Sequence, residues 1–231
     1  MESDRIDELL SIASAALLDA PPKSESPSGD AIRHLNDLLS RRNGFYAFES
    51  ALHVFPVGGA GLPGRSLQEW NDHNLWINSY GGLISRALFF AEDIFGGQFA
   101  VAGDAVHRFD PETAKFTQFA SDVEMWSAQI LARYNFTTGH SIAHAWQVQN
   151  GALPVGHRLT PRIPFCAGGD YSVDNMVLVE SVAAMRYWGD FAQKIAELPD
   201  GVQFEFNSAV IDGLRCAGSV RRDSASCRCF D

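Results

Sequence analysis

The sequence predicts an α+β fold in which helices pack on a mostly antiparallel β-sheet. Short apolar runs separated by tight turns fill residues 86–134, and helical periodicity precedes and follows them. Strand runs and helices are segregated rather than strictly alternating, which favours α+β over a parallel α/β arrangement. With 231 residues, the chain can bury a core that is stable without disulfide bonds.

Two helices separated by a connector are expected at the N-terminal end. Apolar residues recur at helical spacing over 3–19, with Ser3 as a candidate cap. The Pro- and Ser-rich stretch 21–29 breaks a helix, and Asp30 can cap a second one. Asn43-Gly44 then ends that helix.

The chain is therefore divided into three parts. Residues 1–29 form an N-terminal helix and linker, and residues 30–211 form the α+β domain. Residues 212–231 are expected to be a disordered tail, because a terminus without apolar periodicity rarely orders.

A β-hairpin over residues 88–101 is the clearest local signal. Two apolar runs flank a turn in which Gly96 and Gly97 supply backbone angles that other residues resist. Asp93 is expected to cap this turn through its side chain. A shorter apolar run at 51–57 reads as a further strand that Pro56 ends.

Two more strands and a helix follow the hairpin. Strands are expected at 105–109 and 115–119, joined by an Asp110-Pro111-Glu112-Thr113 turn. Ser121 and Glu124 fit a capping box at the start of the next helix. That helix aligns three apolar side chains on one face: Val123, Trp126 and Ile130.

The last third repeats this organisation. A helix is expected at 138–149, capped by Thr138 or Ser141, and strands at 158–166 and 175–180. A helix over 182–198 precedes an alternating strand at 202–206.

The formal net charge of −10 bears on the kind of partner. It argues against nucleic acid, whose phosphates need clustered Lys and Arg, and it allows attraction to a basic protein. No 18-residue apolar run exists, and the N-terminus is acidic where a signal peptide would be basic, so no membrane span is expected and the cytoplasm is the expected location. The cysteine spacing lacks a paired zinc pattern.

Three motifs resemble catalytic or cofactor sites, and each has a plainer interpretation. Residues 59–64 match the dinucleotide fingerprint G-x-G-x-x-G without the βαβ context that it needs, so we expect a surface loop and no cofactor. Ser141 lies in a sequence like a nucleophile elbow, but no acidic residue lies between it and His157, so a triad in the usual order cannot close. His140 and His144 could share a metal on one helical face, but no third ligand is visible nearby. An enzyme built on these three residues, hydrolytic or metal-dependent, remains the alternative.

An aromatic and polar cluster is the candidate partner-binding surface. Trp and Tyr dominate interface energetics, although packing in the core is the competing interpretation. The candidate residues are Trp70, Asp72, Trp76, Tyr80, Glu92 and Asp93.

Several of these stretches together resemble the Smi/Knr family of the SUKH superfamily. The similarity is carried by residues 43–52, the hairpin at 90–99, the turn at 110–113, and the stretches 153–159 and 198–201. The resemblance implies a curved antiparallel sheet with helices packed on it, and an immunity protein that binds a toxin and blocks its active site. Such toxins are commonly basic nucleases. Fungal relatives act in cell-wall signalling, which is a second alternative, and the resemblance transfers no catalytic residue.

Overall fold

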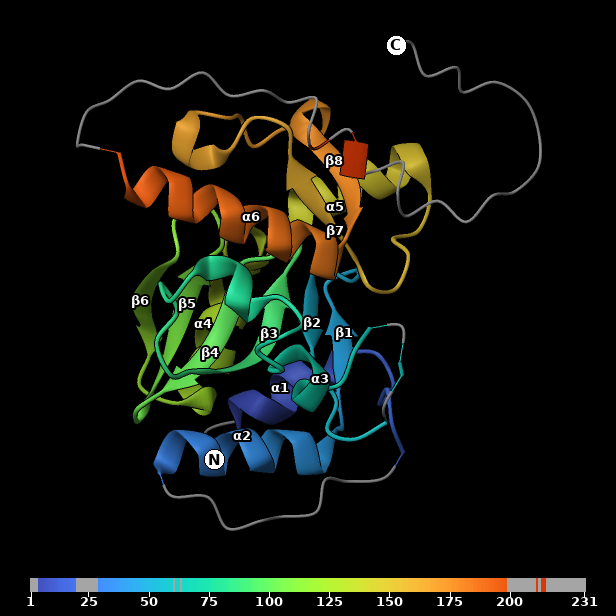
Figure 1. The fold of residues 1–231 in the computed structure, drawn as a ribbon. Coiled ribbons are helices and arrows are strands. Elements are labelled where there is room, and N and C mark those ends of the chain that lie inside the picture. The colour runs from blue at the N-terminus through green and yellow to red at the C-terminus, as the bar shows by residue number, and fades with distance from the viewer. Residues whose placement is uncertain are drawn as a thin grey trace.

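A six-stranded antiparallel sheet forms the centre of the protein (Figure 1). The computed structural model describes residues 4–19, 29–59, 61–62, 64–198, 211 and 213–214. Each strand pairs with the next one along the chain, as expected for strands joined by short turns. In order, the strands are β1 (Phe45–Ala47), β2 (Leu52–Val54), β3 (Leu88–Asp93), β4 (Gln98–Ala102), β5 (Ala105–Asp110) and β6 (Lys115–Ala120). The α+β prediction and the hairpin at 88–101 are confirmed.

One face of this sheet is covered by helix α4 (Val123–Thr138). Trp126 packs edge-on against Phe90 of β3 and Phe99 of β4, with ring centroids 5.1 and 5.7 Å apart. Val123, Trp126 and Ile130 are all fully buried, which confirms the predicted apolar face. Successive residues of a strand point to opposite faces, so Phe89 supplies the other side of the sheet.

The opposite face is covered by the segment that contains the short helices α3 (Leu67–Trp70) and η1 (Ile77–Tyr80). The Trp76 ring lies 5.0 Å from Phe89 and 5.7 Å from Tyr80. Helix α6 (Ser181–Ala196) packs against η1 from outside and crosses the top of the view in Figure 1.

Three residues proposed as partner anchors are therefore core residues. Trp70, Trp76 and Tyr80 have between 0% and 1% of their surface exposed. Their polar atoms are satisfied internally: the Trp70 indole donates to Gln98, and the Tyr80 hydroxyl donates to the carbonyl of Pro111. The expectation that these side chains bind a partner is wrong, because each completes the packing of the sheet. Asp72 alone of this segment's candidates is exposed.

The first helix is shorter than the sequence predicts. Helix α1 (Arg5–Ser11) begins after Asp4, which accepts hydrogen bonds from the amides of Ile6 and Asp7. After Ser11 the backbone bonds to the start of the sheet, where the Ser14 amide donates to the carbonyl of Tyr46 at 2.7 Å. These bonds replace the helical ones expected up to residue 19. The connector expected at 21–29 lies, apart from Gly29, outside the described residues.

The caps of three further helices differ from the predicted ones. Helix α2 (Asp30–Arg41) has Gly29 as its N-cap, and Asp30 is its first residue. Helix α4 is capped by Asp122, whose side chain accepts from the Met125 amide, in place of the Ser121–Glu124 box. Glu124 instead accepts the Arg5 amide at 2.6 Å and so ties α1 to α4. Helix α5 (His140–Asn150) starts after Gly139, neither Thr138 nor Ser141 being its cap.

A second, two-stranded sheet lies beside the hairpin end of the first. Strand β7 (His157–Pro161) pairs antiparallel with β8 (Met176–Glu180), and the 3₁₀ helices η2 (Phe165–Ala167) and η3 (Val173–Asn175) lie between them. The Leu159 amide donates to the carbonyl of Ile94 at 2.9 Å, which attaches β7 to the β3–β4 turn. The strand expected at 202–206 lies outside the described residues, as does the tail 212–231 apart from Gly213 and Leu214.

The burial of Trp76 leads to a stability prediction. We expect Trp76→Ala to lower the free energy of unfolding by about 3–5 kcal/mol, because it removes a ring packed between Phe89 and Tyr80. Urea denaturation followed by circular dichroism measures this. His73→Ala, an exposed change in the same segment, is the control and should stay within about 0.5 kcal/mol. Equal effects of the two changes would contradict the core assignment.

Candidate functional site

A buried cluster of charged and polar side chains lies where the two sheets meet. The Glu92 carboxylate on β3 lies 2.8 Å from Nη2 of Arg158 on β7 and 3.1 Å from Nδ1 of His53 on β2. All three side chains are at most 2% exposed. Burial alone would raise the pKa of Glu92, but the Arg158 charge and the His53 hydrogen bond outweigh it and hold that pKa below its usual value. Burial lowers the pKa of His53, so its imidazole is neutral.

This cluster is closed to a partner. The Tyr46 ring stacks on His53 at 4.4 Å, and Phe55 packs on the edge of the imidazole at 4.5 Å. Glu92 is one of the residues that the sequence offers as a partner contact. Its buried carboxylate instead pairs with Arg158 and His53, so that expectation is wrong. The cluster therefore joins the sheets.

Asp93 points to the other side of β3 and caps the hairpin turn, as predicted. Its Oδ1 accepts from the amides of Phe95 at 2.9 Å and Gly97 at 2.8 Å. Gly96 has a φ of +83°, and a Cβ on Gly97 would lie 2.5 Å from the Asp93 carboxylate. Both glycines are thus required by the turn. Because Asp93 is fully buried, its expected direct contact with a partner is also wrong.

Beyond Asp93 the protein opens into a hollow of about 590 Å³, which we call the aromatic–acidic cleft. It lies where the β3–β4 and β5–β6 turns approach the end of α4 and the loop after β7. Its walls combine aromatic rings with charged side chains. The lining includes Asp93, Arg108, Asp110, Glu112, Phe136, Phe165, Cys166 and Tyr171.

The aromatic wall of the cleft is largely open to solvent. Phe165 and Tyr171 stack with centroids 3.9 Å apart and an interplanar angle of 4°. Phe95 packs edge-on against Phe165 at 5.2 Å and holds the stacked pair in place. Tyr171 is 66% exposed, and Phe136 at the end of α4 is 72% exposed. Exposed rings beside a hollow are typical of a surface that binds another molecule.

The floor of the cleft carries more negative than positive charge. Arg108 Nη2 lies 2.6 Å from Asp93 Oδ2, which pairs the one guanidinium of the lining with one of its three carboxylates. Glu112 accepts from the amides of Phe165 at 3.0 Å and Cys166 at 2.8 Å, so it anchors η2. Asp110 accepts from the Glu112 amide and the Thr113 hydroxyl. Asp110 and Glu112 therefore have no cationic partner in the lining.

Burial is the first cause of the raised pKa values in the cleft, and neighbouring negative charges add to it. Burial raises the pKa of Asp93 to about 6, against the opposing effect of Arg108. Burial raises the pKa of Glu112, and the neighbouring Asp110 adds to that increase. Burial and then the Glu112 charge raise the pKa of Cys166 to about 12, so this exposed thiol is a poor nucleophile at neutral pH.

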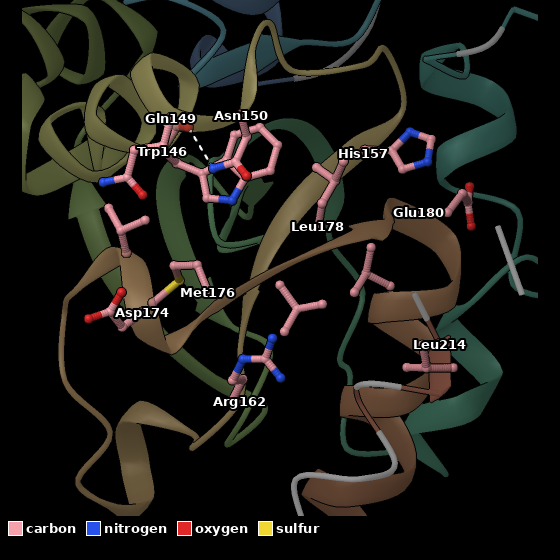
Figure 2. A pocket seen from close by; sticks show the side chains of 13 residues that line it. Trp146, Gln149, Asn150, His157, Arg162, Asp174, Met176, Leu178, Glu180 and Leu214 are labelled. Atoms are coloured by element: carbon pink, nitrogen blue, oxygen red, sulfur yellow. Dashed lines mark hydrogen bonds between the residues drawn. The ribbon is translucent and has the colours of Figure 1, made fainter. Parts of the chain in front are cut away.

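A second hollow, of about 570 Å³, lies along strand β8 (Figure 2). Met176 and Leu178 line its middle, while Arg162 and Asp174 lie at one end and His157 and Glu180 at the other. It is bounded by Leu214, which belongs to the short described piece 213–214 between residues 212 and 215, both outside the described residues. We therefore assign the candidate site to the aromatic–acidic cleft, whose lining comes from a continuous described segment.

The other motifs are engaged in local contacts. His144 Nδ1 lies 2.8 Å from the Glu49 carboxylate and His140 Nε2 lies 3.7 Å from it. Ser141 lies within helix α5, not after a strand, and donates to Asn135 at 2.9 Å. In the glycine-rich loop the Gly61 amide donates to Glu69, so a side chain occupies the place that a phosphate would need.

The described part of the chain contains neither a metal-binding cluster nor a membrane-spanning helix. No group of three His, Cys, Asp or Glu side chains there is placed to hold a metal ion. None of its helices combines the length and apolar character that crossing a membrane requires.

Most of the cleft was missed by reasoning from the sequence. Asp93 and Gly97 were singled out, but only for the turn or for direct partner contact. The turn at 110–113 was noted, yet nothing local connects Glu112 with Phe165 and Tyr171, which lie more than fifty residues further along the chain. A weak signal was available in the aromatic residues that lie outside any apolar periodicity, Phe136 and Tyr171.

Comparisons with known proteins give little beyond this. No protein-family model and no curated protein matches the chain. Among solved structures, it is similar to the crystal structure of Atu4351 from Agrobacterium tumefaciens at 13% sequence identity and a TM-score of 0.48, covering 82% of this chain and 89% of that one.

The buried ion pair leads to a second prediction. Glu92→Gln leaves the Arg158 guanidinium without its counter-charge, and we expect the free energy of unfolding to fall by about 3–5 kcal/mol. Glu8→Gln breaks an exposed ion pair of 2.6 Å with Arg5 and should cost less than about 1 kcal/mol. Chemical denaturation of both variants at neutral pH measures the difference. Similar losses would show that burial does not govern the Glu92 pair.

The raised pKa of Asp93 predicts how stability changes with pH. Between the ordinary pKa of 3.8 and the folded pKa of about 6, the folded protein binds a proton that the unfolded chain has released. The contribution of Asp93 to stability therefore falls as pH rises through this window, by about 2–3 kcal/mol relative to Asp93→Asn. Denaturation of both proteins from pH 4 to pH 7 tests this. A constant difference between them would contradict it.

Proposed function

We propose that this chain is a non-catalytic protein-binding domain of the Smi/Knr type, which neutralises a basic, nuclease-type toxin by covering its active site in the cytoplasm. The aromatic–acidic cleft is the observation that carries the proposal. Its exposed rings, and the negative charge of the carboxylates that line it beside a single guanidinium, offer a preformed surface for a cationic protein. The overall charge of −10 favours encounter with such a partner.

The chemistry of the cleft supports binding more than turnover. Its thiol has a raised pKa, and two of its carboxylates, Asp93 and Glu112, are occupied by backbone amides. Tyr171 and Phe136 belong to the residue classes that contribute most to protein interfaces, and both can be covered without unfolding the chain. We therefore assign the proposed interface to the exposed rings around Tyr171, in place of the buried residues around Trp76.

The experiment identifies the partner and then measures what binding does to it. The chain is cross-linked in its own cells, the cross-linked protein is identified by mass spectrometry, and both are purified. We expect a basic domain with nuclease activity, which is lost in a stoichiometric complex. The double variant Phe136→Ala/Tyr171→Ala should cross-link poorly, and Val148→Ala, an exposed change outside the cleft, should behave as the parent chain. A partner that is acidic, or a nuclease that stays active in the complex, would contradict the proposal.

Charge complementarity predicts a salt-dependent association rate. We expect the rate constant for binding the purified toxin to fall roughly tenfold between about 20 mM and about 500 mM salt, because screening removes long-range attraction. The dissociation rate should change much less. Stopped-flow fluorescence of the tryptophan signal measures both, and an association rate that is independent of salt would argue against electrostatic steering.

A further inference from the structure

We propose that the aromatic–acidic cleft receives an arginine side chain of the protein partner, with the guanidinium lying over the exposed ring of Tyr171 and facing Asp110 and Glu112. This inference rests on the proposed function for the source of the arginine. The cleft itself is formed by residues of this chain and needs no partner to exist. Its volume of about 590 Å³ is well above what one side chain needs.

The aromatic wall selects a flat cation. Tyr171 and Phe165 stack face to face, so one face of the Tyr171 ring is covered by Phe165. Tyr171 remains 66% exposed and can accept a planar group on its open side. A guanidinium stacks on aromatic faces and bonds carboxylates at the same time, whereas an ammonium is a compact and strongly hydrated charge.

The floor of the cleft supplies the countercharge. Arg108, the one cationic side chain of the lining, already pairs with Asp93 at 2.6 Å, so the lining holds no second cation for Asp110 and Glu112. Asp110 is half-buried on the floor of the cleft and can meet the guanidinium directly. Glu112 is only 4% exposed and both of its oxygens accept backbone amides of η2, so it acts on the guanidinium through its charge.

The raised pKa values in the cleft come first from burial, and the neighbouring carboxylates add to them. Burial, together with the charges of Glu112, Asp93 and Asp110, raises the pKa of Tyr171, and the opposing Arg108 does not cancel this effect. The pKa is raised in four titratable groups of the lining: Asp93, Glu112, Cys166 and Tyr171. A cation entering the cleft relieves the repulsion among these groups.

The test uses two small probes that differ in charge and little in shape: N-acetyl-arginine methylamide and its citrulline counterpart. Each is titrated into the isotopically labelled chain while amide NMR signals are followed. We expect the arginine probe to shift the signals of Gly97, Cys166 and Tyr171 with a dissociation constant of roughly 1–10 mM. The citrulline probe should bind at least about tenfold more weakly. Equal binding of the two probes, or shifts that avoid the cleft, would overturn the proposal.

Variants separate the two walls of the cleft. Tyr171→Ala and Glu112→Gln should each weaken the arginine probe severalfold. Tyr134→Ala, an exposed ring outside the lining, and Asp174→Asn, a carboxylate of the other hollow, should leave it unchanged. Should Glu112→Gln disturb η2, the comparison of the two probes on the parent chain still decides.

The outcome is separable from that of the proposed function. If a toxin complex forms but the arginine probe does not bind, only the inference about the cleft is contradicted. If the probe binds but no basic partner is found in cells, only the toxin proposal is contradicted.

Discussion

The carboxylate of Glu92 and the guanidinium of Arg158 meet inside the protein, at the junction of the two sheets. An ion pair in this position adds little net stability, but an unpaired charge there would be very costly. The pair therefore restricts where β7 can lie relative to β3. Because Leu159, the next residue of β7, also bonds to the carbonyl of Ile94, the small sheet is held against the β3–β4 turn at adjacent positions.

The cleft is a consequence of this attachment. With β7 held at the hairpin, the loop that follows it brings Phe165, Cys166 and Tyr171 over the turns of the main sheet. Glu112 completes the closure by accepting the amides of η2 from the β5–β6 turn. Successive residues of one strand thus have separate tasks, since Glu92 joins the sheets while Asp93 shapes the turn beside the cleft.

A preformed hollow of this kind suits a protein that acts by binding. Its carboxylates are oriented by backbone amides and its rings by one another, so little order has to be gained when a partner arrives. In the function that we propose, the exposed rings contribute contact area and the excess of negative charge favours a cationic partner over a neutral one. Both properties support the proposal of a binding domain for a basic protein.

The sequence by itself determined the local elements. The β3–β4 hairpin, the strands on either side of Asp110, and the buried face of α4 follow from periodicity and turn chemistry that neighbouring residues carry. Asp93 was also assigned its cap correctly, because that bond spans only a few residues. Tertiary structure decided which side chains are buried and which meet. The sequence left Trp70 and Trp76 between a partner-binding surface and the core, because it does not show which strand residues pack against them. Likewise, Glu92 meets Arg158 only after the chain has folded back. The cleft belongs to the same class, since its walls come from separate turns and helix ends that only long-range packing brings together.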